Sequence, residues 1–220
     1  MELYHIHLIG NHDRLYKEHS EFTIDKDKFN NRIYNRIYNS NATVDINKYK
    51  ELVEYLNKLL TSVGMPTFDK RINLGEIIEL VLKTGTDQEN LVKILEDAKK
   101  IILADGINLR EQAMEEYRKE NCISLPSRLH SLFACGEEGL DFWSQHIIDN
   151  DVDVFKIKVY DEPFLSNEAL LPSDILNYGE KVESSYNYFH PQKEDLNPLT
   201  DEYLVQGKVK ILEKVMEVRN

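Results

Sequence analysis

The hydrophobic pattern changes its period twice along this chain, and this change constrains the fold more than any other feature. Residues 3–9 alternate with the period of two that a strand requires, and Gly10 follows. Residues 47–119 carry apolar side chains at three-to-four spacing, which is typical of amphipathic helices. Alternation returns in three later segments, residues 129–135, 153–160 and 203–212. A strand, then helices, then several strands is the order of an α+β fold.

The 220 residues have the length of one ordinary domain, and no boundary within them stands out. Hydrophobic residues make up 41% of the sequence, which is enough apolar material for a buried core. We therefore expect a single domain over residues 1–220, with a helical insertion at about 45–120. Within that insertion, a helix capped by Asn108 is expected to continue to about Lys119.

Each strand is expected to bury one of its two faces, because alternate side chains point to opposite sides. The expected inward set comprises Tyr4, Ile6, Leu8, Phe155, Ile157, Val159, Val205 and Val209. His5 and His7 then share the opposite face of the first strand, and Glu202 opens the last strand on its polar face.

The charge balance and the composition exclude several classes of protein. Lys and Arg number 27 against 39 Asp and Glu, a net charge of −12 that disfavours broad, non-specific binding to nucleic acid. There is no apolar run of about 18 residues, so we expect no membrane span, and the start of the chain lacks the pattern of a secretory signal. Two cysteines cannot build a disulfide framework, so we expect a reduced, cytoplasmic protein.

Residues 162–200 form a polar stretch between the last two strand-like segments. Four of the six prolines lie there, namely Pro163, Pro172, Pro191 and Pro198. Because this stretch is long for a connection, we expect a functional loop region with short helices rather than a linker.

Three clusters of reactive or charged residues have simpler explanations than the chemistry that they first suggest. His5 and His7 could clamp a metal, but the pattern supplies no third ligand, so a polar cleft wall is favoured. Ser131 follows His130, yet neighbours on a strand point apart and no nucleophile elbow surrounds the serine. The repeat of Arg-Ile-Tyr-Asn at residues 32–39 could stack bases, but its spacing of four favours one helix face.

Glu202 is the most informative single residue. A glutamate at the start of a strand and facing a cleft can stabilise a developing sugar cation or accept a proton. The alternative is an ordinary exposed acid. No glycine-rich phosphate loop of the P-loop or Rossmann type is present to suggest another nucleotide chemistry.

Three motifs together resemble the ADP-ribosyltransferases of the His-Tyr-Glu class, which includes the poly-ADP-ribose polymerases. Leu3-Tyr4-His5 resembles the first strand of that class, which carries its histidine. Ser131-Leu132-Phe133-Ala134, followed by residues 139–143, is similar to the second motif, where a strand with an aromatic residue precedes a helix. Asp201-Glu202-Tyr203-Leu204-Val205 is similar to the last motif, the strand that carries the glutamate. The block from Leu125 through Arg128 to Phe133 also resembles uncharacterised bacterial proteins grouped near this fold.

The resemblance implies an ADP-ribosyltransferase-like split sheet core, with NAD bound as a substrate in a cleft between two small sheets. His5 would hydrogen-bond the adenosine ribose, the ring of Phe133 would stack on nicotinamide, and Glu202 would favour an oxocarbenium-like transition state. Ser131 and Arg128 belong to the implied cofactor-binding set, and no metal is implied.

Two functions remain open on the sequence. The first is NAD-dependent transfer of ADP-ribose to an unknown protein or nucleic-acid acceptor, or simple hydrolysis of NAD. The second is an inactive transferase-like fold that acts as a binding module. His5 and Glu202 favour the first, whereas Phe133 favours the second because it stands where the class has tyrosine.

Overall fold

The computed structural model describes residues 1–8, 15–35, 106–145, 151–173 and 176–219. The chain divides into two compact units, Met1–Asn39 with Asn108–Asn220 and Ser40–Ile107. Apart from residues 106 and 107, the described residues belong to the first unit. Most of the expected helical insertion at about 45–120 lies outside the described residues, as do residues 36–39 of the Arg-Ile-Tyr-Asn repeat.

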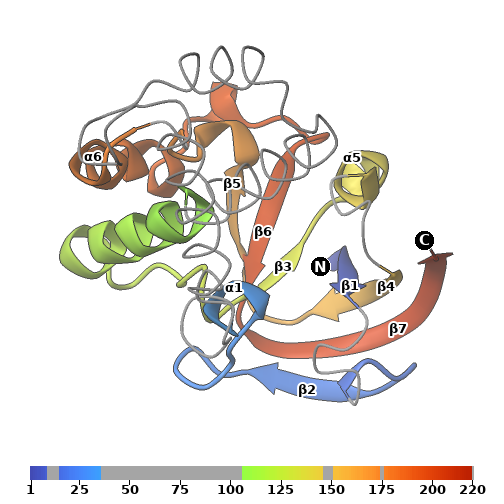
Figure 1. Cartoon of the computed structure of the whole chain (residues 1–220). Helices are drawn as coiled ribbons and strands as arrows, with labels where there is room; N and C mark the ends of the chain where they lie inside the picture. The colour runs from blue at the N-terminus through green and yellow to red at the C-terminus, as the bar shows by residue number, and fades with distance from the viewer. Residues whose placement is uncertain (9–14, 36–105, 146–150, 174–175, 220) are drawn as a thin grey trace, which may run out of the picture. The chain divides into compact units, whose positions relative to one another are not determined.

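The described strands form two antiparallel sheets, and the fold is α+β (Figure 1). The larger sheet has the order β1-β4-β7-β2, with β1 Glu2–Leu8, β4 Val152–Val159, β7 Gly207–Val218 and β2 Glu21–Ile24. The smaller sheet has the order β3-β6-β5, with β3 Leu132–Ala134, β6 Asp201–Val205 and β5 Phe164–Asn167. A bridge between Tyr4 and Cys135 joins β1 to the end of β3, through backbone N–H···O distances of 2.9 and 2.8 Å. The two sheets therefore meet along β1 and β3.

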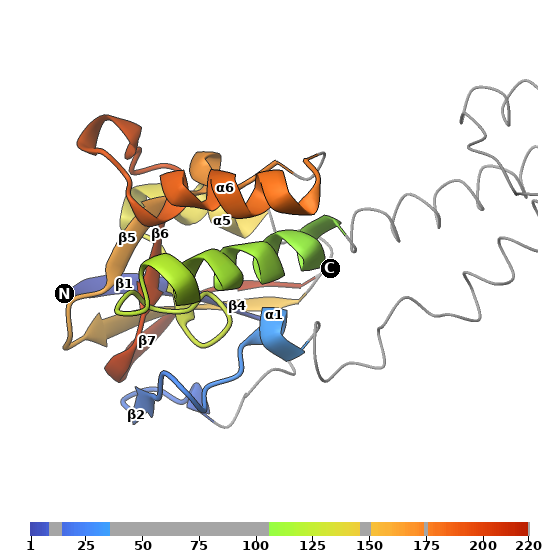
Figure 2. The ribbon, with the colours of Figure 1, turned by 90° about the vertical axis from the view of Figure 1, so that its left-hand side faces the viewer.

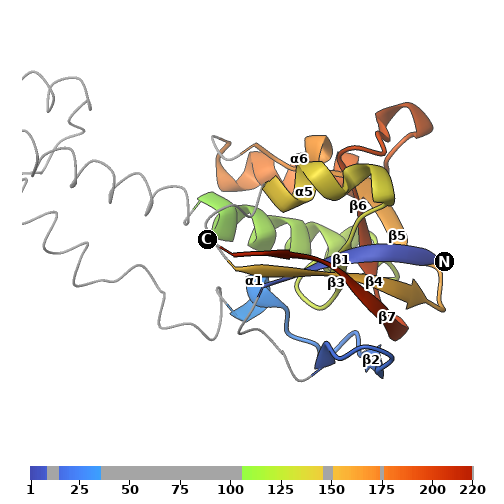
Figure 3. The same cartoon turned by 90° about the vertical axis from the view of Figure 1, so that its right-hand side faces the viewer.

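Helices cover the smaller sheet, as Figures 2 and 3 show from opposite sides. The described helical segments are residues 106–121, α5 Leu140–Gln145, α6 Tyr178–Phe189 and the single turn α1 Arg32–Tyr34. Short 3-10 turns lie at Glu137–Gly139, Glu168–Leu170 and Lys193–Asp195. The helix at 106–121 lies beside α6, and the rings of Tyr117 and Phe189 stack across this contact at 6.1 Å. Because residue 106 is already helical, Asn108 does not cap this helix as expected.

Burial confirms the expected inward residues on the later strands and corrects the expectation for β1. Phe155, Ile157, Val159, Val205 and Val209 are all buried, each with at most 4% of its surface exposed. On β1, by contrast, Leu3, His5 and His7 are buried, whereas the expected inward set Tyr4, Ile6 and Leu8 is only half-buried. The pattern misled because both faces of β1 are covered, so polarity does not mark the outer face.

The last alternating segment is not one strand but two, which lie in different sheets. β6 ends at Val205, and β7 begins at Gly207, whose φ of +80° favours glycine. A Cβ at Gly207 would overlap the carboxylate of Asp161, which accepts a hydrogen bond from the backbone N–H of Lys208 at 3.1 Å. This corner transfers the chain from the smaller sheet to the larger one, so β6 carries Glu202 beside β3.

The proline-containing stretch 162–200 holds more regular structure than the sequence suggested. It contains β5, which forms an edge of the smaller sheet, and the twelve-residue helix α6. A capping box starts α6, in which the Asn177 side chain accepts from the N–H of Glu180 and the Glu180 carboxylate accepts from the N–H of Asn177. Within the described part of the chain, no helix is long and apolar enough to cross a membrane.

Candidate active site

A cavity of about 360 Å³ lies where the two sheets meet. All five residues singled out from the sequence line it, namely His5, Arg128, Ser131, Phe133 and Glu202. The remaining lining residues are mainly apolar or aromatic and include Tyr4, Ile6, Leu8, Tyr16, Phe29, Ile33, Leu132 and Trp143. An apolar cavity with a few polar groups is typical of a small-molecule site, and this volume lies near the lower end of the range for such sites.

His5 lines this cavity and carries a buried hydrogen-bond acceptor. Its Nδ1 lies 2.7 Å from the carbonyl oxygen of Phe133, and a carbonyl can only accept, so Nδ1 carries the proton. Burial, together with a smaller effect of nearby His7, lowers the pKa of His5 to about 3, although the hydrogen bond to Phe133 acts in the opposite direction. The imidazole is therefore neutral, and its Nε2 bears a lone pair. This Nε2 is buried without a hydrogen-bond partner, so a hydroxyl group of a ligand could donate to it.

The wall that β1 contributes is aromatic. The ring of Tyr16 stacks on His7 at 3.9 Å between centroids and on His5 at 5.0 Å. Burial raises the pKa of Tyr16, so its phenol is protonated at neutral pH. Among the described residues, no three His, Cys, Asp or Glu side chains lie together in a way that could hold a metal ion.

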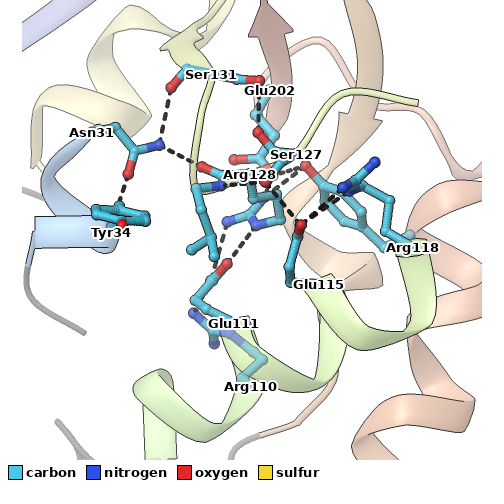
Figure 4. Close-up of polar contacts among 12 residues, drawn as sticks. Asn31, Tyr34, Arg110, Glu111, Glu115, Arg118, Ser127, Arg128, Ser131 and Glu202 are labelled. Carbon is cyan, nitrogen blue, oxygen red and sulfur yellow. Dashed lines mark hydrogen bonds and ion pairs between the residues drawn. The ribbon is translucent and has the colours of Figure 1, made fainter. Parts of the chain in front are cut away.

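The opposite wall holds a buried ionic cluster around Arg128, drawn in Figure 4. The guanidinium donates from Nε to Oε2 of Glu111 at 2.8 Å and from Nη2 to Oε1 of Glu111 at 3.3 Å. Nη1 of Arg128 donates to the hydroxyl of Tyr188 at 2.6 Å and to Oε1 of Glu202. The Tyr188 hydroxyl in turn donates to the same Oε1 atom. Three elements thus meet at one cation: the helix at 106–121, α6 and β6.

Ion pairing keeps the Arg128 guanidinium charged although it is buried. The side chains of Arg128, Glu111 and Glu202 are at most 6% exposed. Burial opposes the charged guanidinium, but the carboxylates of Glu111 and Glu202 outweigh it and hold the pKa of Arg128 well above its usual range. Burial and the Glu202 carboxylate raise the pKa of Tyr188, so this phenol remains a donor.

The loop that carries Arg128 is fixed by side-chain hydrogen bonds to its backbone. The amide nitrogen of Asn31 donates to the carbonyl oxygens of Arg128 and Ser131. The Ser131 hydroxyl donates to the carbonyl oxygen of Ser127 at 2.7 Å, and the Ser127 hydroxyl donates to Glu115 at 2.8 Å. Ser131 is completely buried, and its hydroxyl donates to the backbone of this loop.

Phe133 contacts both His5 and Arg128. Its carbonyl oxygen holds His5, and its ring lies against Arg128, with 4.9 Å from the guanidinium carbon to the ring centroid. The ring of Tyr188 lies at 4.8 Å from the same carbon. Two aromatic rings therefore contact the guanidinium in addition to its hydrogen-bond partners. One face of the ring that the resemblance assigns to nicotinamide is thus turned to Arg128.

Glu202 is positioned by the start of β6. The neighbouring Asp201 side chain accepts from the Asn167 amide and from the backbone N–H of Asn197, both at 2.8 Å. The indole nitrogen of Trp143, on α5, donates to the Asp201 carbonyl oxygen at 3.0 Å. These bonds fix the backbone on either side of the strand, so the Glu202 carboxylate is held at the cavity.

Sequence reasoning missed the partners of Arg128 and Glu202. Glu111 lies on a helix that was expected, and it is followed four residues later by Glu115, which is also buried. Tyr188 lies on α6, whose capping box at Asn177 and Glu180 was a recognisable start signal. These signals predict helices, but which acid or phenol faces a buried cation depends on tertiary packing.

The comparison with protein families assigns the chain to a family. Residues 3–217 match the model described as protein of unknown function (DUF2441), and because this match covers nearly the whole chain, the protein belongs to that family. A search of curated proteins finds no match.

Proposed function

We propose that this protein binds NAD in the cavity between its sheets and cleaves the bond between nicotinamide and ribose. The ADP-ribose would then pass to an acceptor or to water. The observation that carries the proposal is that His5, Phe133 and Glu202, from three strands far apart in sequence, line the same cavity. The two antiparallel sheets would then be the split core of an ADP-ribosyltransferase-like fold.

The polar groups of the cavity suit the ribose parts of such a substrate. A ribose hydroxyl can donate to Nε2 of His5, which satisfies a buried acceptor that otherwise has no partner. The volume of about 360 Å³ encloses part of a dinucleotide rather than all of it, so the remainder would lie towards the opening. The apolar lining excludes water from the reacting bond.

The carboxylate of Glu202 supplies the electrostatic part of the mechanism. As nicotinamide leaves, positive charge develops on the ribose, and a fixed carboxylate in an apolar site stabilises that charge. Arg128 contacts Glu202 and would offset its charge, but Glu111 also contacts this guanidinium from the other side. Glu111 is also paired with Arg110 at 3.5 Å, so two carboxylates and two guanidiniums balance formally, and Glu202 is the carboxylate of this group that lines the cavity.

A second candidate is a binding module without catalysis. The observation that favours it is the engagement of Glu202 itself, whose carboxylate is held by both Arg128 and Tyr188. Phe133 favours the same alternative, because it lacks the hydroxyl of the tyrosine that the resemblance places there. In this case the cavity would bind a ligand without breaking a bond.

Incubation of the purified protein with NAD, followed by assay of free nicotinamide, tests the proposal. The wild type is expected to release nicotinamide, and Glu202→Gln is expected to lower the rate by about 10²–10³ because the amide keeps the shape but not the charge. His5→Ala should mainly raise KM. Binding of NAD without release of nicotinamide would leave the binding module, and no binding of NAD would overturn both functions for this ligand.

A further inference from the structure

The two oxygens of the Glu202 carboxylate have different surroundings. Oε1 accepts from Nη1 of Arg128 and from the hydroxyl of Tyr188. Among the described residues, none donates a hydrogen bond to Oε2. Since Glu202 lines the cavity, Oε2 is the atom available to a ligand there.

The groups that hold Oε1 are themselves fixed. Tyr188 is completely buried on α6, in a cluster with Met114, Phe189 and Leu204. Arg128 is paired with Glu111 through two hydrogen bonds and lies between the rings of Phe133 and Tyr188. A carboxylate anchored through one oxygen by two such donors keeps one orientation, which is the preorganisation that a catalytic carboxylate needs.

We propose that Arg128 and Tyr188 are positioning residues, which hold Glu202 by Oε1 so that Oε2 faces the ligand, and that Glu111 is the counter-ion that holds Arg128 in place while it does so. This inference rests on the proposed function, because it assigns roles at the same cavity. Glu111 acts without contact to the ligand: it lies on the other side of the guanidinium from Glu202.

Glu115 provides a matched control for Glu111. It lies one turn further along the same helix and is also buried, and it pairs with Arg118 at 2.8 Å and accepts from Ser127. Glu115→Gln and Glu111→Gln therefore both remove one buried, paired carboxylate from one helix. The difference is that Glu111 contacts Arg128, whereas Glu115 reaches Arg128 only through the backbone of its loop.

The test compares Tyr188→Phe, Glu111→Gln and Glu115→Gln by melting temperature and by kcat and KM for nicotinamide release. Tyr188→Phe and Glu111→Gln are expected to lower kcat by about tenfold to a hundredfold, since a displacement of about 1 Å at a reacting group costs up to roughly 10²-fold. Their KM should stay within about twofold, because the ligand keeps its ground-state contacts. Glu115→Gln is expected to lower the melting temperature, because Arg118 loses its ion pair, yet to keep kcat within about twofold, because the amide oxygen can still accept from Ser127 and hold the loop. A wild-type kcat in Tyr188→Phe, or a kcat that follows melting temperature in all three variants, would overturn the proposal.

A second measurement requires no activity and so separates this inference from the proposed function. If Glu111 and Glu202 share Arg128, either glutamine variant leaves the guanidinium one carboxylate, whereas the double variant leaves it none. The double variant Glu111→Gln, Glu202→Gln should then lose more melting temperature than the two single losses added together. Additive losses would overturn the shared counter-ion even if nicotinamide is released. Absence of nicotinamide release with non-additive losses would overturn the proposed function and leave the shared cation in place.

Discussion

The two walls of the cavity bury ionisable groups to a similar extent but by opposite means. On the β1 wall, His5 loses its charge: burial lowers its pKa to about 3, and its ring stacks with Tyr16. On the opposite wall, Arg128 keeps its charge because Glu111 and Glu202 surround it. The site therefore has a neutral acceptor on one side and a buried, ion-paired carboxylate on the other, and a ligand must match both.

Removal of the shared cation should produce the largest effect on stability. Arg128→Leu leaves the Glu202 carboxylate buried without a counter-ion and the Glu111 carboxylate with Arg110 at 3.5 Å, and we expect a loss of about 3–5 kcal/mol in the free energy of unfolding. Urea unfolding measures this loss. Arg219→Leu is the control, since Arg219 pairs with Asp153 at the surface, where an ion pair contributes little, and it should cost much less than Arg128→Leu.

A variant that removes all three charges tests the same point without depending on one substitution. The combination Glu111→Leu, Arg128→Met and Glu202→Leu removes both buried carboxylates together with the cation that they share, so we expect it to recover most of the stability that Arg128→Leu loses. A combination no more stable than Arg128→Leu would show that packing, rather than charge pairing, limits this wall.

The neutral wall predicts a dependence of stability on pH. The unfolded chain binds a proton at this histidine below about pH 6.5, whereas folded His5 resists protonation down to about pH 3. Stability from this residue is therefore fully present above pH 6.5 and is lost as the pH falls, by at most about 1.4 kcal/mol per pH unit. His5→Gln, which does not titrate, should flatten the wild-type slope between pH 6 and 4. An equal slope in the two proteins would mean that His5 is charged in the folded state.

A smaller effect is expected at Glu115, which stabilises the charged wall through the Ser127 loop. Burial opposes its ionised form, but hydrogen bonds from Arg118 and Ser127 outweigh this and lower the pKa of Glu115. Its contribution is therefore present above the unfolded pKa, near 4.5, and is lost as the pH falls through the folded value. Glu115→Gln should cost about 1–2 kcal/mol at pH 7 and less in acid, as measured by urea unfolding at each pH.

The sequence predicted the strands that carry the site better than the ion pairs between its elements. Alternation located β1 and β4 to within one or two residues, and the motifs around His5, Phe133 and Glu202 predicted side chains that the structure brings to one cavity. These features depend on local periodicity and on short segments. The pairing of Arg128 with Glu111 and Tyr188 joins residues 17 and 60 positions apart, and helical periodicity does not show which polar residue is buried.

The strand errors have a similar origin. Residues 203–212 alternate as one strand would, yet the chain changes sheet at Gly207, because the positive φ there creates a corner. β2, at Glu21–Ile24, was not predicted, since four residues give too short a pattern. On β1, two covered faces removed the contrast in polarity that marks an inward side.

A crystal structure with a non-hydrolysable analogue of NAD would show whether NAD binds in this cavity against Glu202. We expect the nicotinamide riboside half to lie in the cavity, with a ribose hydroxyl that donates to Oε2 of Glu202. Arg128 and Tyr188 should still hold Oε1. A hydroxyl of the other ribose should donate to Nε2 of His5. An analogue bound outside the cavity, or one that contacts Glu202 through Oε1 after displacing Tyr188, would contradict the account.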